Sequence, residues 1–195
     1  LGIDVGTSGA KTLLIDADGD VVASATSEYP LYTPRPLWAE QEPEDWWRAT
    51  VGSIRSVLER SGVRPADIAG LGLTGQMHGM VALDDKGQVL RRCIMWNDQR
   101  TGEQCAQIMR TVGPERFLAL TGNVALPGFT APKILWVRQN EPEVYARIAQ
   151  VLLPKDYIRY RLTGEYATEV SDASGTVLFD VAHRRWSAEV LAALD

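Results

Sequence analysis

The first stretch of the chain that could do chemistry is an acidic residue followed by a glycine-bearing turn and a lysine. Asp4 lies near the end of an apolar, β-branched run, and the turn Gly6-Thr7-Ser8-Gly9 leads on to Lys11. A turn with two glycines and two hydroxyls offers backbone N–H and side-chain O–H donors without bulk, so a phosphate can approach closely. A carboxylate beside it suits a hydrated Mg²⁺ that bridges a nucleotide. The same four residues also make a good hairpin loop, so a structural role stays open.

Two familiar nucleotide-binding motifs do not fit this stretch. The Walker loop needs glycine directly before its lysine, but Ala10 precedes Lys11. The dinucleotide fingerprint needs a helix after its glycines, whereas residues 12–15 are typical of a strand. What remains is Asp-x-Gly-Thr-x-x-x-Lys on a hairpin, and from these residues alone an anion site and a plain turn both stay open.

A second polar cluster follows the buried strand expected over residues 68–73. It contains Gln76, Met77 and His78, with glycines on both sides. Such a strand end can aim polar groups outward while its backbone comes close to a ligand. No Ser-Asp pair or metal ligand stands at a telling distance from His78, so hydroxyl recognition is favoured over nucleophilic catalysis. A hydrogen-bonded structural histidine is the alternative.

A third cluster repeats this design. Trp96, Asn97 and Asp98 come directly after an apolar run. Asn97 and Asp98 could accept from and donate to neighbouring hydroxyls of a polyol. Asp98 could equally cap the helix expected to start near Thr101, and the two roles do not exclude each other.

Regular elements predicted around these clusters place the polar residues at strand ends. Hydrophobic periodicity and turn residues predict strands over 1–5, 12–15, 21–22, 68–73 and 80–83, and helices from 43 to Gly62, over 103–112, from Thr130 to 140, over 154–162 and from Ser187. Residues 27–41 and 168–176 are expected to be loops, and Thr130 is expected to be a helix N-cap. The pair Trp46-Trp47 could stack on a sugar, but core packing is the better interpretation on an amphipathic helix.

Composition limits the class of protein. The 195 residues are 45% hydrophobic, and 25 acidic and 20 basic residues give a net charge of −5 without a basic stripe. Neither nucleic acid nor a membrane is therefore expected as a partner. Cys93 and Cys105 have no Cys/His cluster around them, which indicates neither a disulfide framework nor zinc and favours the cytoplasm. The missing initiator Met and the end at Asp195 inside a helical pattern suggest a trimmed chain or fragment.

Several of these segments resemble one family. Asp4 to Lys11 resembles the first phosphate motif of the sugar kinase, hexokinase, Hsp70 and actin superfamily. Gly128 to Asn140 looks like the first signature of the FGGY carbohydrate kinases. Residues 76–79, 96–98 and 153–157 are similar to family members that phosphorylate D-xylulose. The resemblance covers essentially the entire chain, in order.

The resemblance implies an α/β, ribonuclease-H-like fold with a mixed sheet and flanking helices. Residues 1–195 would be the N-terminal, sugar- and Mg²⁺-binding domain, and a second ATPase domain would be absent from this chain. Asp4 would hold the Mg²⁺ of ATP through water. The residues expected to face the phosphates are Gly6, Thr7, Ser8 and Lys11. Those expected on the sugar side are Gln76, Met77, His78, Trp96, Asn97 and Asp98.

The implied reaction is phosphoryl transfer from ATP to the terminal hydroxyl of D-xylulose, in a possible homodimer. It needs positioning, charge neutralisation and a carboxylate that accepts the hydroxyl proton. That carboxylate and the adenine site resemble nothing in the chain, so no general base is assigned to Asp98, Asp156 or Asp172, and the chain alone is expected to be inactive. Glycerol, gluconate or ribulose as substrates, and a non-catalytic sugar-sensing module, are the alternatives.

Overall fold

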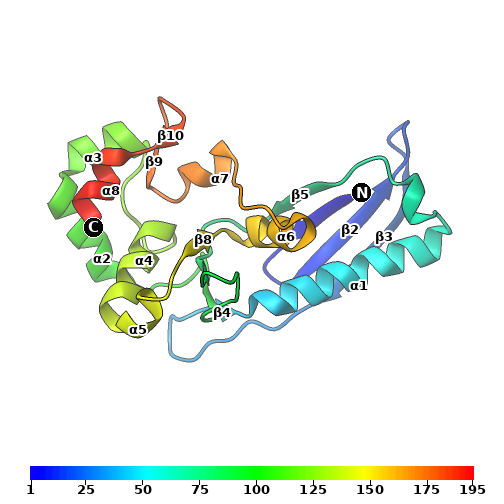
Figure 1. Ribbon diagram of the computed structural model, residues 1–195, viewed down its shortest axis with the longest axis horizontal. Coiled ribbons are helices and arrows are strands. Elements are labelled where there is room, and N and C mark those ends of the chain that lie inside the picture. Colours follow the sequence, from blue (N-terminus) through cyan, green and yellow to red (C-terminus); the bar gives the residue numbers. More distant parts are fainter.

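The computed structural model describes all of residues 1–195, which form a sheet lobe and a helical lobe joined by a middle layer. In Figure 1 the sheet lobe lies on the right, with the N-terminus, and the helical lobe lies on the left, with the C-terminus. The predicted fold class is confirmed, because a mixed sheet is flanked by helices.

The sheet lobe is a four-stranded sheet in the order β3-β2-β1-β5, with one long helix packed on it. Strand β1 runs antiparallel to β2 and parallel to β5. Its members are β1 (Gly2–Val5), β2 (Gly9–Ile15), β3 (Val21–Glu28), β5 (Gly72–Gly75) and α1 (Pro43–Ser61). Ile3 and Val5 are buried in one core with Trp46 of α1, whereas Asp4 between them is exposed. Because successive side chains of a strand point to opposite faces, Asp4 lies on the face away from α1.

The helical lobe has a core of its own. Its elements are α2 (Gly102–Val112), α3 (Pro114–Thr121), α4 (Thr130–Asn140), α5 (Pro142–Tyr145), α8 (Ala188–Leu194), β9 (Phe179–Asp180) and β10 (Arg185–Trp186). Ile108, Phe117, Leu135 and Val190 are all buried in this core. The two lobes therefore bury separate sets of apolar side chains.

The middle layer connects the lobes through short strand pairs and two helices. Strand β4 (Glu40–Gln41) pairs with β7 (Cys93–Ile94), and β6 (Val81–Leu83) pairs with β8 (Gln150–Leu152). The helices are α6 (Pro154–Thr163) and α7 (Val170–Ser174). Val81 and Tyr157 join the core of the sheet lobe, whereas Met80 and Ile94 pack under α4. The layer thus makes contact with both lobes.

Most of the long predicted elements are confirmed, and the errors fall on short ones. The β1–β3 meander is present, α1 ends at Gly62 with φ 68°, and the Ser187 side chain caps α8 by accepting from Val190 N. The strand expected over 68–73 is wrong in its position: a 3₁₀ turn occupies Pro65–Asp67, and β5 begins only at Gly72. The loop expected over 168–176 is also wrong, since it contains α7, whose first N–H groups donate to Glu169.

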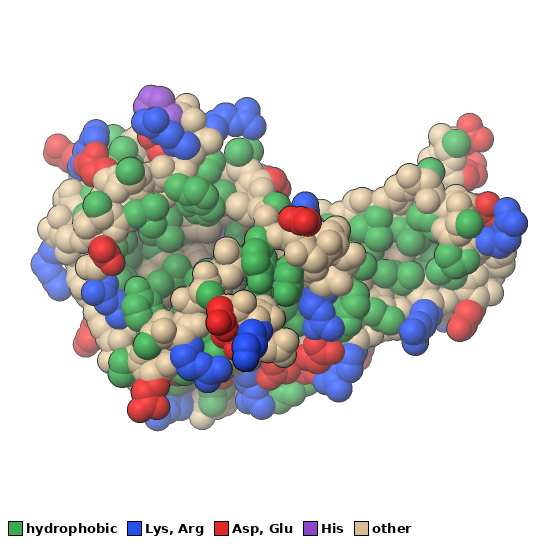
Figure 2. Space-filling model, viewed as in Figure 1, with side chains coloured by type: hydrophobic (Ala, Val, Ile, Leu, Met, Phe, Trp, Pro, Cys, Tyr) green, Lys and Arg blue, Asp and Glu red, His purple; other side chains and the backbone are tan.

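Side chains of both charges are interspersed over the face shown in Figure 2. No helix combines the length and the apolar character needed to cross a bilayer.

Trp46 is fully buried and donates through Nε1 to Gln41 Oε1 at 3.0 Å. The core role preferred for Trp46 is therefore confirmed.

Candidate active site

The open face of the sheet carries a pair of opposite charges. Asp4 and Lys11 are directly opposite each other in the β1–β2 ladder, and Thr74 is opposite Asp4 in the β1–β5 ladder. All three line a shallow cavity of about 390 Å³, and both charged side chains are exposed. Neither charge has an ion-pair partner in the protein, so both are available to a ligand.

The turn between β1 and β2 consists of Gly6, Thr7 and Ser8, and hydrogen bonds hold it in place. Gly6 N donates to Gly9 O at 3.1 Å, while the N–H groups of Thr7 and Ser8 donate to no backbone carbonyl. The Tyr29 hydroxyl donates to Gly6 O at 2.5 Å. Free N–H groups on a rigid turn are what an anion needs. No three His, Cys, Asp or Glu side chains gather around a metal position, so a Mg²⁺ at Asp4 would draw its remaining ligands from phosphates and water, as Mg²⁺ commonly does.

The predicted cluster at residues 76–78 lies at the end of β5, beside the end of β1. Gln76 N donates to Val5 O at 2.8 Å, which continues the parallel pairing by one residue. His78 then adopts a left-handed conformation, with φ 65°, and Gly79 N donates to Met77 O at 2.8 Å. The N–H groups of Met77 and His78 donate to no backbone carbonyl. This turn therefore presents free backbone donors, as the β1–β2 turn does.

The His78 ring is packed rather than free. It meets the Phe129 ring edge-on, with ring centroids 4.8 Å apart, and a Cβ at Gly175 would lie 2.3 Å from the ring. Burial, together with the nearby Lys133 ammonium, lowers the pKa of His78 to about 4, so the imidazole is neutral at pH 7. A neutral ring offers one donor and one acceptor, which suits a hydroxyl.

The cluster at residues 96–98 splits into an outward part and a buried part. Trp96 is 44% exposed, and its Nε1 donates to Thr7 Oγ1 at 3.1 Å. Asp98 is fully buried, where its carboxylate accepts from Ala39 N at 2.7 Å and pairs with Arg100 at 2.7 Å. Of the two roles left open for Asp98, the helix cap is not found, because α2 begins at Gly102 with Thr101 at its N-cap and without a side-chain cap bond. Asp98 holds the loop instead.

Three buried polar atoms in these two clusters lack a hydrogen-bond partner in the protein. They are Gln76 Oε1, His78 Nδ1 and Asn97 Oδ1. Buried polar atoms are nearly always paired, so orphaned ones indicate groups that await a ligand or water. All three belong to residues predicted for the sugar side.

Gln41 joins the two halves of the site and is not among the residues predicted from the sequence. Its Nε2 donates to Thr7 O at 2.7 Å, and its Oε1 accepts from Gln76 Nε2 at 2.9 Å. With the Trp96–Thr7 bond, this brings the β1–β2 turn together with both polar clusters. Gln41 stands at the end of a proline-rich stretch, where nothing in its type or spacing distinguishes it.

The start of α4 supplies another missed contact. Thr130 was expected to be the N-cap, but Phe129 occupies that position without a side-chain cap bond. The Thr130 hydroxyl donates to His78 O at 3.2 Å instead, and Lys133 Nζ donates to the same oxygen at 2.8 Å. The α4 helix therefore supports the His78 turn from behind.

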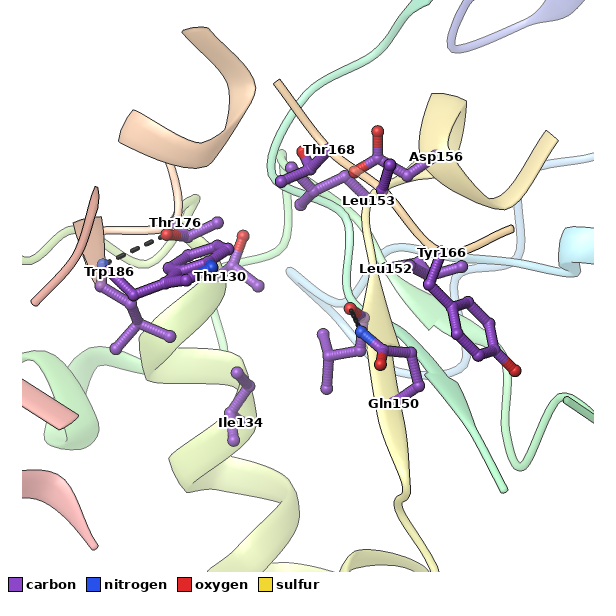
Figure 3. Close-up of a pocket in the computed structure, with 13 residues that line it drawn as sticks. Thr130, Ile134, Gln150, Leu152, Leu153, Asp156, Tyr166, Thr168, Thr176 and Trp186 are labelled. Carbon is purple, nitrogen blue, oxygen red and sulfur yellow. Dashed lines mark hydrogen bonds between the residues drawn. The ribbon is translucent and has the colours of Figure 1, made fainter. Parts of the chain in front are cut away.

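A separate cavity of about 320 Å³ lies between the middle layer and the helical lobe. In Figure 3, Thr130 and Ile134 of α4 lie on one side and Gln150, Leu152 and Asp156 on the other. None of the predicted site residues lines it. Thr130 is its one link to the His78 turn, so the site is assigned to the strand ends and not to this cavity.

Comparison with known proteins adds a family match along the whole chain. Residues 1–195 match the model described as "FGGY family of carbohydrate kinases, N-terminal domain". The chain is 49% identical over 195 residues to the xylulose kinase of Klebsiella pneumoniae, covering all of this chain and 40% of the relative. A glycerol kinase of Nitrobacter hamburgensis is 36% identical over 201 residues and is covered to the same 40%.

The fold comparison agrees. The structure superposes on a crystal structure of a xylulose kinase from Rhodospirillum rubrum with a TM-score of 0.94 at 33% identity, over 99% of this chain and 40% of the other. The chain thus spans about two fifths of the length of the relatives it matches.

Proposed function

The chain belongs to the FGGY family of carbohydrate kinases, and from this premise we propose that it is the sugar- and Mg²⁺-binding part of an enzyme that transfers phosphate from ATP to D-xylulose, giving xylulose 5-phosphate. The observation that carries the proposal is the junction at Thr7. There Trp96 and Gln41 tie the phosphate turn to the two clusters that hold unpaired polar atoms.

The proposed phosphate side is the open sheet face and its turn. Asp4 holds Mg²⁺ through water, and Lys11 neutralises phosphate oxygens beside it. Backbone donors of Gly6, Thr7 and Ser8 face the same phosphates. Unpaired charges on an exposed face fit this role, because phosphoryl transfer asks mainly for positioning and charge neutralisation. Mg²⁺ held at Asp4 would supply positive charge that offsets the charge developing on the phosphate oxygens.

On the proposed sugar side, both backbone and side-chain groups bind the substrate. The free N–H groups of Met77 and His78, and the side chains of Gln76, Trp96 and Asn97, bind the hydroxyls and the carbon face of the ketose. A planar aromatic ring with an apolar face suits the C–H surface of a sugar. Asp98 acts from behind as a positioning residue, because Ala39 and Arg100 already occupy its carboxylate.

The proton acceptor and the adenine site are proposed to lie in a second domain outside residues 1–195. The 40% coverage of the relatives supports this division. No carboxylate of this chain is placed as general base, and Asp156 and Asp172 are engaged with Lys155 at 2.7 and 3.0 Å. Residues 1–195 alone are therefore expected to show no kinase turnover, which an assay of ADP release with D-xylulose would check.

A panel of sugars tests the proposal with the full-length protein. ATP-dependent turnover is measured with D-xylulose, D-ribulose, gluconate and glycerol by coupled ADP detection. D-xylulose is expected to have the highest kcat/KM. Turnover of glycerol but not of D-xylulose would overturn the substrate assignment. Sugar binding without turnover of any of them would favour a non-catalytic sensing module.

A further inference from the structure

The most unusual buried group of the molecule is Lys133 in α4. Its side chain is fully buried, and no carboxylate lies within ion-pair distance. An ammonium without a counter-ion in an apolar setting is costly, and here burial lowers the pKa of Lys133 to about 7. A lysine at such a position is expected to have a role in hydrogen bonding to the groups around it.

Those neighbours are two backbone carbonyls. Lys133 Nζ donates to His78 O at 2.8 Å and to Gly128 O at 2.6 Å. Two acceptors match the two N–H groups of a neutral amine, and an ammonium has one N–H to spare. The contact can therefore persist in either protonation state.

The first carbonyl, His78 O, belongs to a turn whose backbone conformation needs support from the surrounding structure. His78 is a non-glycine residue in the left-handed region, which side chains with a Cβ disfavour. Such a conformation persists only when the surrounding structure imposes it. Lys133 and Thr130 both donate to His78 O, so α4 fixes the peptide that follows the free N–H groups of Met77 and His78.

The second carbonyl lies behind the other sugar-side loop. A Cβ at Gly128 would stand 2.7 Å from Trp96 O, so the two backbones are in direct contact. Lys133 Nζ holds the same Gly128 through its carbonyl. One amine therefore supports the turn of His78 and the loop of Trp96 together.

We propose that Lys133 is a positioning residue for the sugar, which sets the spacing between the backbone donors at Met77-His78 and the ring of Trp96. The inference rests on the proposed function in that the ligand is the sugar substrate. Lys133 itself touches neither the substrate nor the phosphates. Its loss should therefore affect sugar binding and leave ATP binding intact.

The test compares three variants of the full-length protein. Lys133→Met keeps the length of the side chain and removes both donors, and Thr130→Val removes only the second donor to His78 O. Ser53→Ala is the control, because it breaks a buried hydrogen bond to Thr12 of 2.7 Å between β2 and α1, away from the site. KM for D-xylulose, KM for ATP and kcat are measured for each.

Lys133→Met is expected to raise KM for the sugar roughly 10- to 100-fold, and Thr130→Val roughly 3- to 10-fold, as expected for lost hydrogen bonds. KM for ATP should stay within about twofold in both. Ser53→Ala should lower the melting temperature and leave both KM values unchanged. An unchanged sugar KM in a folded Lys133→Met protein, or an equal rise in KM for ATP, would overturn the proposal.

Hydrogen exchange provides a readout that does not depend on turnover. Amide exchange is followed by mass spectrometry in peptides that cover residues 76–79 and 96–98. Both segments should exchange faster in Lys133→Met, only residues 76–79 should do so in Thr130→Val, and neither should in Ser53→Ala. Unchanged exchange in both would refute the role of Lys133 even if no sugar is phosphorylated, whereas a wild-type protein without kinase activity would refute only the proposed function. If Lys133→Met does not fold, Thr130→Val tests the His78 carbonyl on which the proposal depends: an unchanged sugar KM and unchanged exchange over residues 76–79 in that variant would overturn the proposal.

Discussion

The two halves of the candidate site are built in opposite ways. The phosphate half is one hairpin, where neighbouring strands bring Asp4 and Lys11 together within eight residues of chain. The sugar half is assembled from segments far apart in sequence: Lys133 reaches His78 across 55 residues, and Trp96 reaches Thr7 across 89. Regular strand pairing is sufficient to place Asp4 beside Lys11. The proposed hydroxyl-binding groups, by contrast, are positioned by hydrogen bonds between distant segments.

The halves also differ in how they treat polar groups. On the proposed phosphate side Asp4 and Lys11 are exposed and have no ion-pair partner, so water solvates them when no ligand is bound. On the sugar side polar atoms are buried, and some of them lack partners. Because an unpaired buried group is costly, a sugar that satisfies it gains affinity and selectivity. If the contrast is correct, variants of the first half should change turnover and variants of the second should change sugar binding.

The largest effect is expected from Asp4→Ala. Loss of the carboxylate removes the protein's hold on Mg²⁺, so kcat of the full-length enzyme should fall roughly 100-fold or more. Asp4 is exposed and without partners, so the free energy of unfolding should change by only about 0.5 kcal/mol. Steady-state kinetics and thermal melting check the two parts. Asp85→Ala, in an exposed turn, is the control and should leave both unchanged. Collapse of the fold in Asp4→Ala would return Asp4 to a structural role.

The second prediction concerns the proposed sugar half, which His78→Ala should impair. Removing the ring takes away a buried hydrogen-bonding group and its packing on Phe129, so KM for the sugar should rise roughly tenfold, with little change in KM for ATP. Initial rates over a grid of sugar and ATP concentrations measure both. His78→Asn separates ring from backbone, because asparagine tolerates the left-handed region better than alanine does. A rise in KM for ATP larger than that for the sugar would contradict the division into two halves.

A smaller effect is expected at Gly128. In Gly128→Ala the new Cβ would meet Trp96 O at 2.7 Å, so one backbone has to shift. KM for the sugar should rise roughly three- to tenfold, since a displacement of a few tenths of an ångström weakens contacts without removing them. Gly102→Ala is the matched control, because no atom lies within 4 Å of its Cβ. Equal kinetics for the two alanine variants would show that Gly128 does not support Trp96.

The same contrast explains how far the sequence could predict the molecule. The hairpin, α1 and α8 follow from local signals: alternation, a proline start, a glycine end and a serine cap. The eight-residue phosphate motif is local too. The role of Gln41 could not be predicted, because it depends on pairings among three distant segments that no spacing reveals.

Short elements failed for a related reason. Strands β9 and β10 have two residues each, too few for a period to show. Helix α7 lies in a run of small polar residues that is equally typical of a loop. Asp98 had the right type and place for a cap, but a buried arginine two residues later competed for its carboxylate. For Lys133 one signal was present, a lone lysine on an otherwise apolar helix face.

The smallest expected effect is a pH dependence of stability that belongs to the sugar half. The pKa of Lys133 is lowered by burial from 10.5 to about 7 in the folded protein. Between these values the unfolded chain binds the proton more tightly, so raising the pH through this window should stabilise the folded state, by at most about 1.4 kcal/mol per pH unit. Burial lowers the pKa of the neighbouring His78 to about 4, so its window lies below pH 7, whereas burial raises the pKa of Cys93 from 9.0 to about 12, which opposes the Lys133 effect only above about pH 9.

Thermal melting of the full-length protein at pH 7, 8 and 9 measures this dependence as a difference between wild type and Lys133→Met. Between pH 7 and 9 the melting temperature of the wild type should rise relative to that of the variant by several degrees, in line with about 2 kcal/mol. Lys86→Met, an exposed lysine, should run parallel to the wild type. If the melting temperature of Lys133→Met depended on pH in the same way as that of the wild type, Lys133 would have an ordinary pKa. Lys133 would then be a charged ammonium at pH 7 to 9, stabilised by the carbonyls of His78 and Gly128. The proposed sugar half would in that case contain a buried positive charge, and the contrast with the charged phosphate half would be smaller.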